Sequence, residues 1–275
     1  MEGRGGPWTI QKLEKVRNYL VRYQDVMLKQ KWAKTVYIDA FCGSGTYKLR
    51  GARDFTEGSA LQAIDLERPF SHYHLIEKSK KSLGKLRELI ERREFTRTVD
   101  YHAGDVNELL PPIVRALKSD QRAVVFADPY GMQLDWRTVT AVASVPRCDF
   151  WLLVPTSSLL RLATKNPNRR TTAWETRLDQ FMGEREWRTR WYESTGQTQF
   201  FDEGEEVLRT ATLDLVTADF RKLLESAFPK GGVARNVFHL KDGNRVLFTL
   251  MFACSNPSPK AQGIAMNIAN HLLKD

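Results

Sequence analysis

The sequence is poor in cysteine and has no long apolar run, and both absences exclude classes of protein. Its three cysteines, Cys42, Cys148 and Cys254, are far apart and form no CxxC pair. An odd number at this spacing argues against a disulfide framework or a zinc site, and indicates a reducing compartment, the cytoplasm. No apolar run approaches the roughly 20 residues that span a bilayer. Residues 1–7 are glycine-rich and lack the apolar core of a signal peptide, so we expect a loose tail there.

Several motifs are absent as well. No G-x-x-x-x-G-K occurs, which argues against a nucleoside triphosphatase. No Pro-Cys pair occurs, which disfavours cytosine C5 methylation because that reaction needs a thiolate nucleophile. Gly43 and Gly45 do not have the G-x-G-x-x-G spacing of a dinucleotide-binding loop, so a dinucleotide oxidoreductase is the least favoured enzyme class. Cys42, beside these glycines, is expected to be a small packing residue.

The composition is that of an ordinary globular protein with an uneven positive charge. The chain has 275 residues, 42% of them hydrophobic and 27% charged, and a net charge of +9. Residues 1–35 carry eight Lys or Arg against three acids, and residues 78–97 again carry eight against three. Clustered cations raise affinity for nucleic acid through counterion release. The alternative is a solvated cationic face without a polyanionic partner.

Short apolar runs alternate with helical stretches, a pattern typical of buried parallel strands in an α/β protein. The expected strands are residues 36–41, 72–77, 99–102, 123–127 and 149–154. A helix over residues 9–33 is expected to pack on the sheet and carry its cations, Lys12 among them, on the outside. Another helix should follow Pro111-Pro112.

The alternation stops after residue 155, which divides the chain into three parts. Residues 1–155 hold the N-terminal helix and the ligand-binding part of a single α/β domain. Residues 156–207 are rich in Trp and Arg without clear strands, and predict a helical insertion after the fifth strand. Residues 208–275 should complete the sheet with a helix over 208–228 and a hairpin, since Asp-Gly separates two apolar runs there. A mostly parallel, Rossmann-like sheet with a C-terminal antiparallel hairpin is the layout of class I methyltransferases.

Four segments end in glycines or an acid at strand ends, and should converge on one crevice. They are residues 37–45 (YIDAFCGSG), 75–77 (LIE), 104–105 (GD) and 126–131 (FADPYG). Open α/β sheets bind ligands outside the carboxyl ends of their strands. This chemistry suits a nucleoside-containing cofactor, S-adenosylmethionine.

Each strand end has an expected role toward that cofactor. Gly43 and Gly45 let the backbone approach the methionine moiety because no Cβ intervenes, and a nearby acid, Asp39, serves its amino group. Glu77 is placed to accept both ribose hydroxyls. Asp105 or its backbone amide can read the adenine amino group. The remaining candidate cofactor-binding residues in these segments are Phe41 and Gly104.

The fourth segment, Asp128-Pro129-Tyr130, occupies the catalytic position of this fold. Amino-methylating enzymes carry Asp/Asn-Pro-Pro-aromatic there, whereas this chain has a single proline. Asp128 and the Pro129 carbonyl can accept hydrogen bonds from a target amine, and Tyr130 can stack on a base. The alternative is a proline-bounded turn with a structural aromatic. No metal site is expected, since His72, His74 and His102 fall in or beside strands where core or surface roles prevail.

At these residues the chain resembles the three-Cys-motif partner protein family over roughly its first 160 residues. The shared pattern comprises Lys12-Leu13-Glu14, Tyr37-Ile38-Asp39-x-Phe41-x-Gly43-x-Gly45, Gly58-Ser59-x-Leu61, Tyr73-His74-x-x-Ile76-Glu77, Gly104-Asp105-x-Asn107, Asp128-Pro129-Tyr130-Gly131 and Asp149-x-x-Leu152-x-x-Pro155. The resemblance implies a bacterial protein with a class I, S-adenosylmethionine-binding fold. It also implies a partner that bears a three-cysteine motif similar to a radical S-adenosylmethionine signature.

We therefore predict a cytoplasmic methyltransferase that uses S-adenosylmethionine and acts on nucleic acid, RNA rather than DNA, at a base amino group. The basic helices and the Trp- and Arg-rich insertion would hold the polyanion. Two alternatives stay open. One is a non-enzymatic cofactor-binding protein that docks on a three-cysteine protein. The other is a methyltransferase for a small molecule or a protein.

Overall fold

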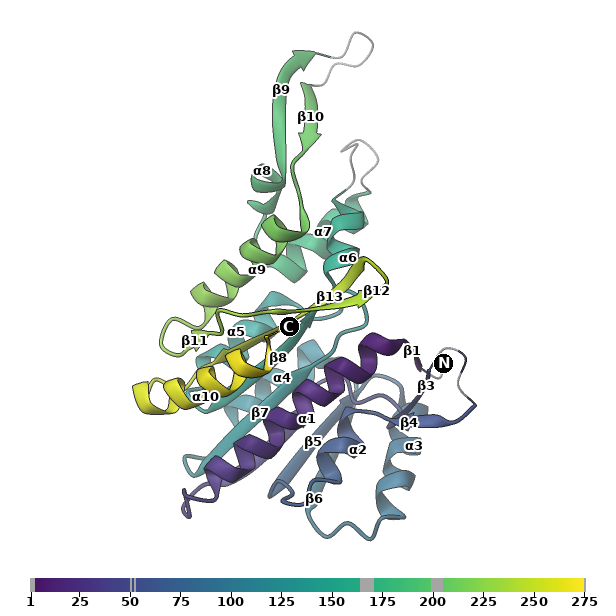
Figure 1. Cartoon of the computed structure of the whole chain (residues 1–275), viewed down its shortest axis with the longest axis vertical. Coiled ribbons are helices and arrows are strands. Elements are labelled where there is room, and N and C mark those ends of the chain that lie inside the picture. The colour runs from purple at the N-terminus through teal and green to yellow at the C-terminus, as the bar shows by residue number, and fades with distance from the viewer. Residues whose placement is uncertain (1–2, 50, 52, 164–170, 199–204, 275) are drawn as a thin grey trace.

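The structure is a computed structural model that describes residues 3–49, 51, 53–163, 171–198 and 205–274 (Figure 1). Its centre is an eight-stranded sheet with the order β11-β13-β8-β7-β2-β5-β6, in which β12 also pairs with β13. The strands are β2 (Lys34–Asp39), β5 (His72–Glu77), β6 (Thr98–Ala103), β7 (Gln121–Ala127), β8 (Cys148–Val154), β11 (Gly232–Val233), β12 (Phe238–Asp242) and β13 (Arg245–Cys254).

The direction of the strands confirms the predicted fold class. Strands β6, β5, β2, β7 and β8 run parallel to one another, whereas β13 runs antiparallel to β8, β12 and β11. Gly243 and Asn244 connect β12 to β13, and Gly243 has φ of +57°, which confirms the hairpin turn. The chain order reverses at β2, between β5 and β7, so the ligand-binding crevice of such a sheet is expected at the carboxyl end of β2.

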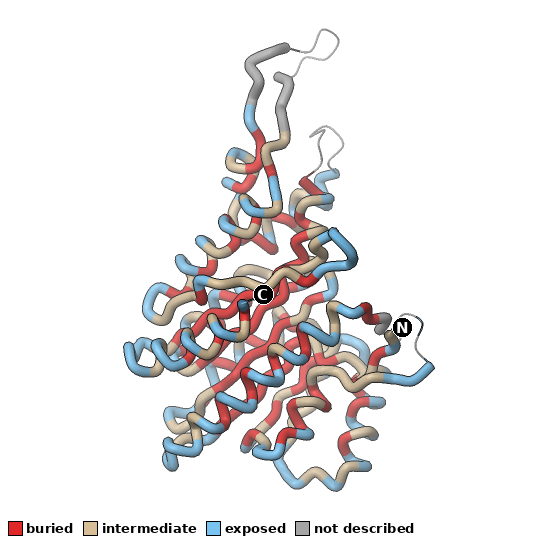
Figure 2. The backbone as a smooth tube through the Cα atoms, in the orientation of Figure 1, coloured by how far each residue is buried: buried red, intermediate tan, exposed pale blue. Residues whose placement is uncertain are grey.

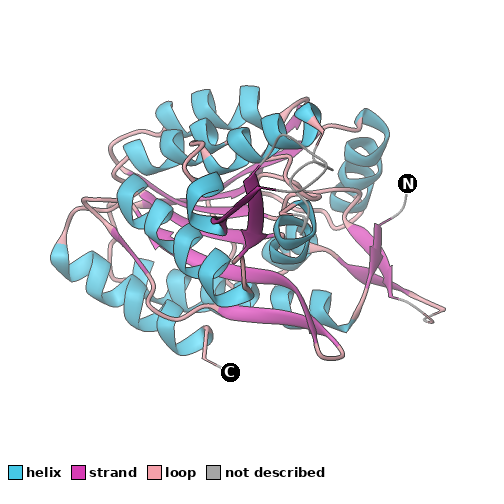
Figure 3. Cartoon of the chain, turned by 90° about the horizontal axis from the view of Figure 1, so that it is seen from above, coloured by secondary structure: helices cyan, strands magenta, loops and turns pink. Residues whose placement is uncertain are grey.

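Helices cover both faces of the sheet, as Figure 3 shows from above. One face carries α1 (Pro7–Met27), α2 (Ser59–Ile64), α3 (Lys80–Glu91) and α10 (Pro259–Leu272), and the other carries α4 (Val106–Arg115), α5 (Trp136–Ser144) and α9 (Leu213–Ala227). Side chains alternate between the faces along each strand. Tyr37 therefore belongs to the core under α1, while Val36 and Ile38 belong to the core under α4. Strand β8 is buried throughout, and β2 and β7 are buried except at their first one or two residues (Figure 2).

The N-terminal segment differs from the expected loose tail. Gly3–Gly5 forms β1, which pairs in parallel with β3 (Thr46–Leu49), and β3 pairs with β4 (Phe55–Glu57). A Cβ at Gly5 would come within 2.7 Å of the Tyr47 ring, so the glycine allows this close approach. The helix that follows begins at Pro7 and ends at Met27, earlier than the predicted 9–33 at both ends. Proline is favoured in a first helical turn because its missing N–H has no partner there.

The prediction that a helix follows Pro111-Pro112 was wrong. Helix α4 begins at Val106 and contains both prolines. The Asp105 side chain caps it by accepting from the Asn107 amide at 3.0 Å. This cap and a buried apolar face, Val106, Leu110 and Val114, stabilise the helix across the two proline positions.

The insertion is helical, as predicted, but it also contains a hairpin that the sequence did not reveal. The helices are α6 (Thr156–Leu162), α7 (Thr172–Met182) and α8 (Trp187–Trp191). They are followed by β9 (Tyr192–Thr198) and β10 (Glu205–Arg209), an antiparallel pair that extends away from the sheet (Figure 1). The helix expected at 208–228 therefore starts later, at Leu213, where the Thr212 hydroxyl accepts from the Leu215 amide. Residues 164–170 and 199–204 of the insertion lie outside the described residues.

Candidate functional site

A pocket of about 370 Å³ lies at the carboxyl ends of β2, β5 and β6. This volume falls in the range of pockets that bind small molecules and cofactors. Four of the predicted cofactor-binding residues line it, namely Phe41, Glu77, Gly104 and Asp105. They come from three strand ends that are far apart in sequence, so the parallel sheet brings them together.

Glu77 is half-buried at the end of β5. Its Oε1 accepts from the Ser79 amide at 2.7 Å, just before α3 begins. This contact fixes the carboxylate against the turn and leaves it at the pocket wall. The backbone thus orients the acid that the sequence predicted as the ribose-binding group.

Asp105 combines a structural role with its place in the pocket. Its Oδ1 accepts from the amide of Asn107, and its Oδ2 lies 3.1 Å from Lys78 Nζ. Burial raises the pKa of Asp105, but the hydrogen bonds from Asn107 and Lys78 outweigh it and hold the pKa below its usual value. The carboxylate is therefore charged at neutral pH, and the hydrogen bond by which it caps α4 fixes its position.

Asp39 lies beneath the glycine loop and has no exposed surface. Its carboxylate accepts from the Phe41 amide and from the Tyr37 hydroxyl, each at 3.2 Å. Burial raises its pKa to about 6, partly offset by hydrogen bonds from Ser59, Phe41 and Tyr37. In this arrangement Asp39 shapes the loop, and it does not line the pocket.

The two glycines of the loop also stand outside the pocket lining, and both have positive φ. The φ angle is +61° at Gly43 and +82° at Gly45. A Cβ at Gly45 would come within 2.7 Å of Leu86, whereas a Cβ at Gly43 would meet nothing within 4 Å. Gly45 therefore serves close packing, and the space beside Gly43 is open.

The segment after β7 presents an exposed aromatic next to a paired acid. Tyr130 is 87% exposed, while Pro129 is buried. Asp128 forms an ion pair with Lys12 of α1, whose side chain is only 8% exposed. None of residues 128–130 lines the pocket, although Asp128 is near enough to raise the pKa of Asp39.

The expectation that Lys12 lies on the outside of its helix was wrong. Lys12 precedes Val16 by four residues, so both lie on the buried face of α1. Burial of an amino group requires a charge partner, and Asp128 supplies it. The helical spacing could have revealed this pair, because the position belongs to the apolar stripe.

Several pocket residues had no recognisable pattern in the sequence. Arg177 and Gln180 of α7 line the pocket, and the Arg177 guanidinium lies 2.8 Å from Asp135 at the start of α5. Asn107 connects the pocket walls, since its Oδ1 accepts from the Asp135 amide and its Nδ2 donates to the Gln133 carbonyl. The insertion thus contributes a wall of the pocket, which only the folded chain shows.

The tryptophans of the insertion do not form an exposed stacking surface. Trp187 and Trp191 are fully buried, and their indole N–H groups donate to Asp179 and Asp219. Trp174 alone of the three is exposed, at 42%. Trp187 and Trp191 therefore cannot stack on a nucleic acid, and of the three tryptophans in the predicted polyanion-binding insertion only Trp174 is exposed for such a contact.

Comparison with solved structures finds proteins of similar fold. The chain superposes on protein LPL1258 of Legionella pneumophila, of the DUF519 family, with a TM-score of 0.55, 12% identity, and 98% and 93% of the two chains covered. A S-adenosylmethionine-dependent methyltransferase of Clostridium acetobutylicum gives 0.43, at 9% identity over 88% and 91%. Trm1 of Pyrococcus horikoshii, solved with S-adenosyl-L-methionine, gives 0.46, at 11% identity over 90% and 56%. These similarities concern the fold.

Sequence comparisons identify no family for the chain. No family model matches it, and no curated protein matches it. The resemblance to the three-Cys-motif partner proteins is therefore not supported by a family match and stays a prediction. Among the described residues, no helix has both the length and the apolar character needed to cross a bilayer.

Proposed function

We propose that this protein is a methyltransferase that uses S-adenosylmethionine and acts on RNA at a base amino group. The observation that carries the proposal is the arrangement at the carboxyl ends of the central strands. Glu77 and Asp105 face one pocket at the ends of β5 and β6. The end of β7 next to β2 presents Asp128 and an exposed Tyr130.

The pocket residues fit the chemistry of the cofactor. A carboxylate at the end of β5 can accept from two ribose hydroxyls, and Glu77 is held for this by the Ser79 amide. Phe41 provides an aromatic wall at the end of β2. The open space beside Gly43 allows a ligand to approach the backbone of the loop. When bound, S-adenosylmethionine supplies an electrophilic methyl group on a sulfonium centre.

The residues after β7 would position the substrate. Asp128 would accept a hydrogen bond from the target amine, whose nitrogen would form the new bond to carbon as the methyl–sulfur bond breaks and would then release a proton to solvent. Tyr130 would stack on the base, a contact worth about 1–3 kcal/mol in single-strand binding proteins. Since alignment of the amine with the methyl group is the main requirement, positioning by these two residues could supply much of the rate.

Positive charge supports nucleic acid as the substrate. The net charge is +9, and several lysines follow Glu77 at the N-terminus of α3. Lys78 lines the pocket, and Lys80 and Lys81 are exposed on the next turn. A phosphate backbone entering along this helix would pass the pocket.

One observation favours the non-enzymatic alternative. Asp128 is already paired with the buried Lys12, so its carboxylate has a strong partner before any substrate arrives. If that pair is purely structural, the protein would bind the cofactor and dock on a partner, such as a three-cysteine protein, without methyl transfer.

The first test is calorimetric titration of S-adenosylhomocysteine into wild type, Glu77→Ala and Glu91→Ala. Glu91 is an exposed acid at the far end of α3, so its variant is the matched control. We expect micromolar binding that Glu77→Ala weakens by about tenfold or more, because charge-assisted hydrogen bonds are lost, and that Glu91→Ala leaves unchanged. Equal binding by all three proteins would contradict the assignment of the pocket.

Methyl transfer to RNA then separates the two functions. Wild type and Asp128→Ala are compared for incorporation of labelled methyl groups into an RNA pool. Incorporation that disappears in Asp128→Ala, with S-adenosylhomocysteine binding retained, supports the enzyme. Binding without incorporation by either protein supports the non-enzymatic alternative.

A further inference from the structure

Three histidines and one aspartate gather on the sheet away from the pocket lining. His72 and His74 belong to β5, and Asp100 and His102 belong to β6, the strand at the edge of the sheet. In the parallel register Asp100 lies opposite His74, and His102 lies opposite Ile76. Side chains two residues apart on a strand point to the same face, so the pairing collects all four on the face that carries α4.

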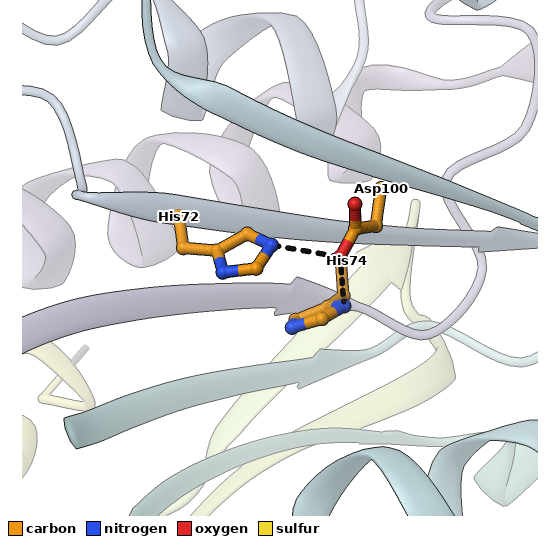
Figure 4. Close-up of side chains that lie close together, drawn as sticks. All are labelled: His72, His74 and Asp100. Carbon is orange, nitrogen blue, oxygen red and sulfur yellow. Dashed lines mark hydrogen bonds and ion pairs between the residues drawn. The ribbon is translucent and has the colours of Figure 1, made fainter. Parts of the chain in front are cut away.

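The polar atoms of this cluster converge (Figure 4). His72 Nε2 lies 2.8 Å from Asp100 Oδ2, and His74 Nδ1 lies 3.5 Å from the same oxygen. One ligand atom from each of His72, His74 and Asp100 lies within 4.8 Å of the ligand atoms of the other two. His102 Nε2 is 3.1 Å from His74 Nδ1. One carboxylate oxygen thus faces two imidazole nitrogens, with a third imidazole beside them.

From this geometry we propose that His72, His74 and Asp100 form a binding site for a divalent transition-metal ion of the Zn²⁺ type. In a tetrahedral zinc site with bonds of about 2.0–2.2 Å, neighbouring ligand atoms are about 3.3–3.6 Å apart. The His74–Asp100 separation of 3.5 Å falls in this range, and the His72–Asp100 separation of 2.8 Å is shorter. Small side-chain rotations would therefore bring the Asp100 oxygen and each imidazole nitrogen to bonding distance from one ion.

The surroundings of the cluster suit an ion rather than a dry core. The side chains of His72 and His74 are 25% and 15% exposed, and that of Asp100 is 46% exposed, so an ion can enter from solvent. Two imidazoles and one carboxylate are borderline ligands, which zinc and its neighbours in the first transition row accept. His102 is the candidate for a fourth ligand, because its Nε2 is at ligand spacing from His74 Nδ1.

The imidazole rings of His72 and His74 are stacked, with 4.3 Å between their centroids. This stacking places the two rings side by side on one face of β5, and a neutral imidazole offers a lone pair to a metal ion.

The proposed ion would link the edge strand to its neighbour. Among the described residues, β6 pairs with β5 alone, and its carboxyl end leads into Gly104 and Asp105 at the pocket. A bond network from β5 to β6 through the metal would stabilise this edge. The role is structural, because His72 and His74 are about 16 and 10 Å along β5 from Glu77, at about 3.3 Å per residue.

The test is calorimetric titration of ZnCl₂ into chelator-treated protein, together with melting curves at the same zinc concentrations. Wild type is compared with His74→Gln, Asp100→Asn and the control His271→Gln, which changes an exposed histidine of α10. We expect one Zn²⁺ per wild-type chain and a rise in Tm on binding. His74→Gln and Asp100→Asn should each weaken binding by at least tenfold, whereas His271→Gln should behave as wild type.

Two results would overturn the proposal. One is folded wild-type protein that gives neither binding heat nor a rise in Tm at millimolar Zn²⁺, which would make the cluster a metal-free hydrogen-bond network. The other is a loss in His271→Gln as large as in the cluster variants. If His74→Gln fails to fold, Asp100→Asn, which keeps the volume of the side chain, carries the comparison. Because only metal binding is read, the result is independent of the proposed methyl transfer.

Discussion

The ion pair between Lys12 and Asp128 joins a helix to the strand end where catalysis is proposed. The side chain of Lys12 is only 8% exposed, while that of Asp128 is 27% exposed. A buried ion pair often adds little net stability, but removal of one partner is costly because the other charge is left unpaired. The pair should therefore behave as a unit.

A double-mutant cycle tests this coupling. Asp128→Asn should lower the free energy of unfolding by about 2–4 kcal/mol, because it leaves the Lys12 ammonium buried without a charge partner. Lys12→Met should cost less, because water reaches the remaining carboxylate. The double variant should be more stable than the sum of the two single effects predicts, as measured by urea unfolding. Strict additivity would show that the two side chains do not interact in solution.

Asp39 should make the stability of the protein depend on pH. Burial raises its pKa from 3.8 to about 6 in the folded state. The folded protein thus binds this proton more tightly than the unfolded chain does, so its stabilising effect is complete below pH 4 and disappears as pH rises through 6. Over its full range, this change in the pKa of Asp39 corresponds to about 3 kcal/mol in the free energy of unfolding.

The variant Asp39→Asn isolates that dependence. It keeps an acceptor for the Phe41 amide but has no titrating proton. The unfolding free energy of wild type minus that of the variant should decrease by about 2.4 kcal/mol between pH 4 and pH 7, because the unfolded carboxyl is already partly deprotonated at pH 4. Chemical denaturation at several pH values measures it. A difference that stays constant with pH would place the pKa of Asp39 near its ordinary value.

Residues at strand ends could be identified from the sequence, whereas residues whose role depends on packing could not. Glu77 and Asp105 follow apolar runs, and the topology of a parallel sheet is enough to place them together. Lys12 was assigned to the wrong side because its charge was given more weight than its helical position. Arg177 belongs to the insertion and lines the pocket, and no sequence pattern around it indicates that contact.

At the scale of elements, the loop between β2 and β3 offers a matched pair of glycines. Both Gly43 and Gly45 have φ values that favour glycine. Only Gly45 is closely packed, against Leu86 of α3 and Leu61 of α2. A substitution at Gly43 therefore tests backbone strain alone, whereas one at Gly45 tests backbone strain together with steric conflict.

Alanine at each position gives different expected costs. Gly43→Ala should destabilise by about 1 kcal/mol, the cost of a left-handed conformation with a Cβ. Gly45→Ala should cost this amount and a further 1–3 kcal/mol or so for overpacking against the two helices. Thermal unfolding of both variants measures the difference. Equal losses would mean that α2 and α3 move aside without cost.

Elements with a strong periodic pattern were predicted, and elements that depend on partners were not. The five parallel strands and the C-terminal hairpin follow from apolar runs and an Asp-Gly turn. β1 exists because it pairs with β3, and its composition, Gly-Arg-Gly, has little strand propensity. Helix α4 starts before its two prolines because Asp105 caps it, a local contact that outweighs the proline signal.

At the scale of the whole molecule, the pocket lies next to a positively charged helix, α3. The turn after β5 leads from Glu77 directly into this helix, so its cations lie beside the pocket. A sheet of this class could serve many substrates, and the fold alone does not select one. The net charge of +9 is the property that supports a nucleic acid in the proposed function, of which RNA is the one proposed.

RNA binding should therefore depend steeply on salt. A surface that neutralises about five phosphates of single-stranded RNA gives a slope of about −3.5 in a plot of log K against log salt, or about 100-fold weaker binding between 50 and 200 mM. Fluorescence anisotropy of a labelled RNA measures this slope for wild type and for Lys80→Ala/Lys81→Ala. The double variant should lower its magnitude by about 1.4, because two phosphate contacts are lost. S-adenosylhomocysteine affinity, measured alongside, should change little with salt in both proteins. RNA binding that does not respond to salt would instead favour a small molecule or a protein as the methyl acceptor.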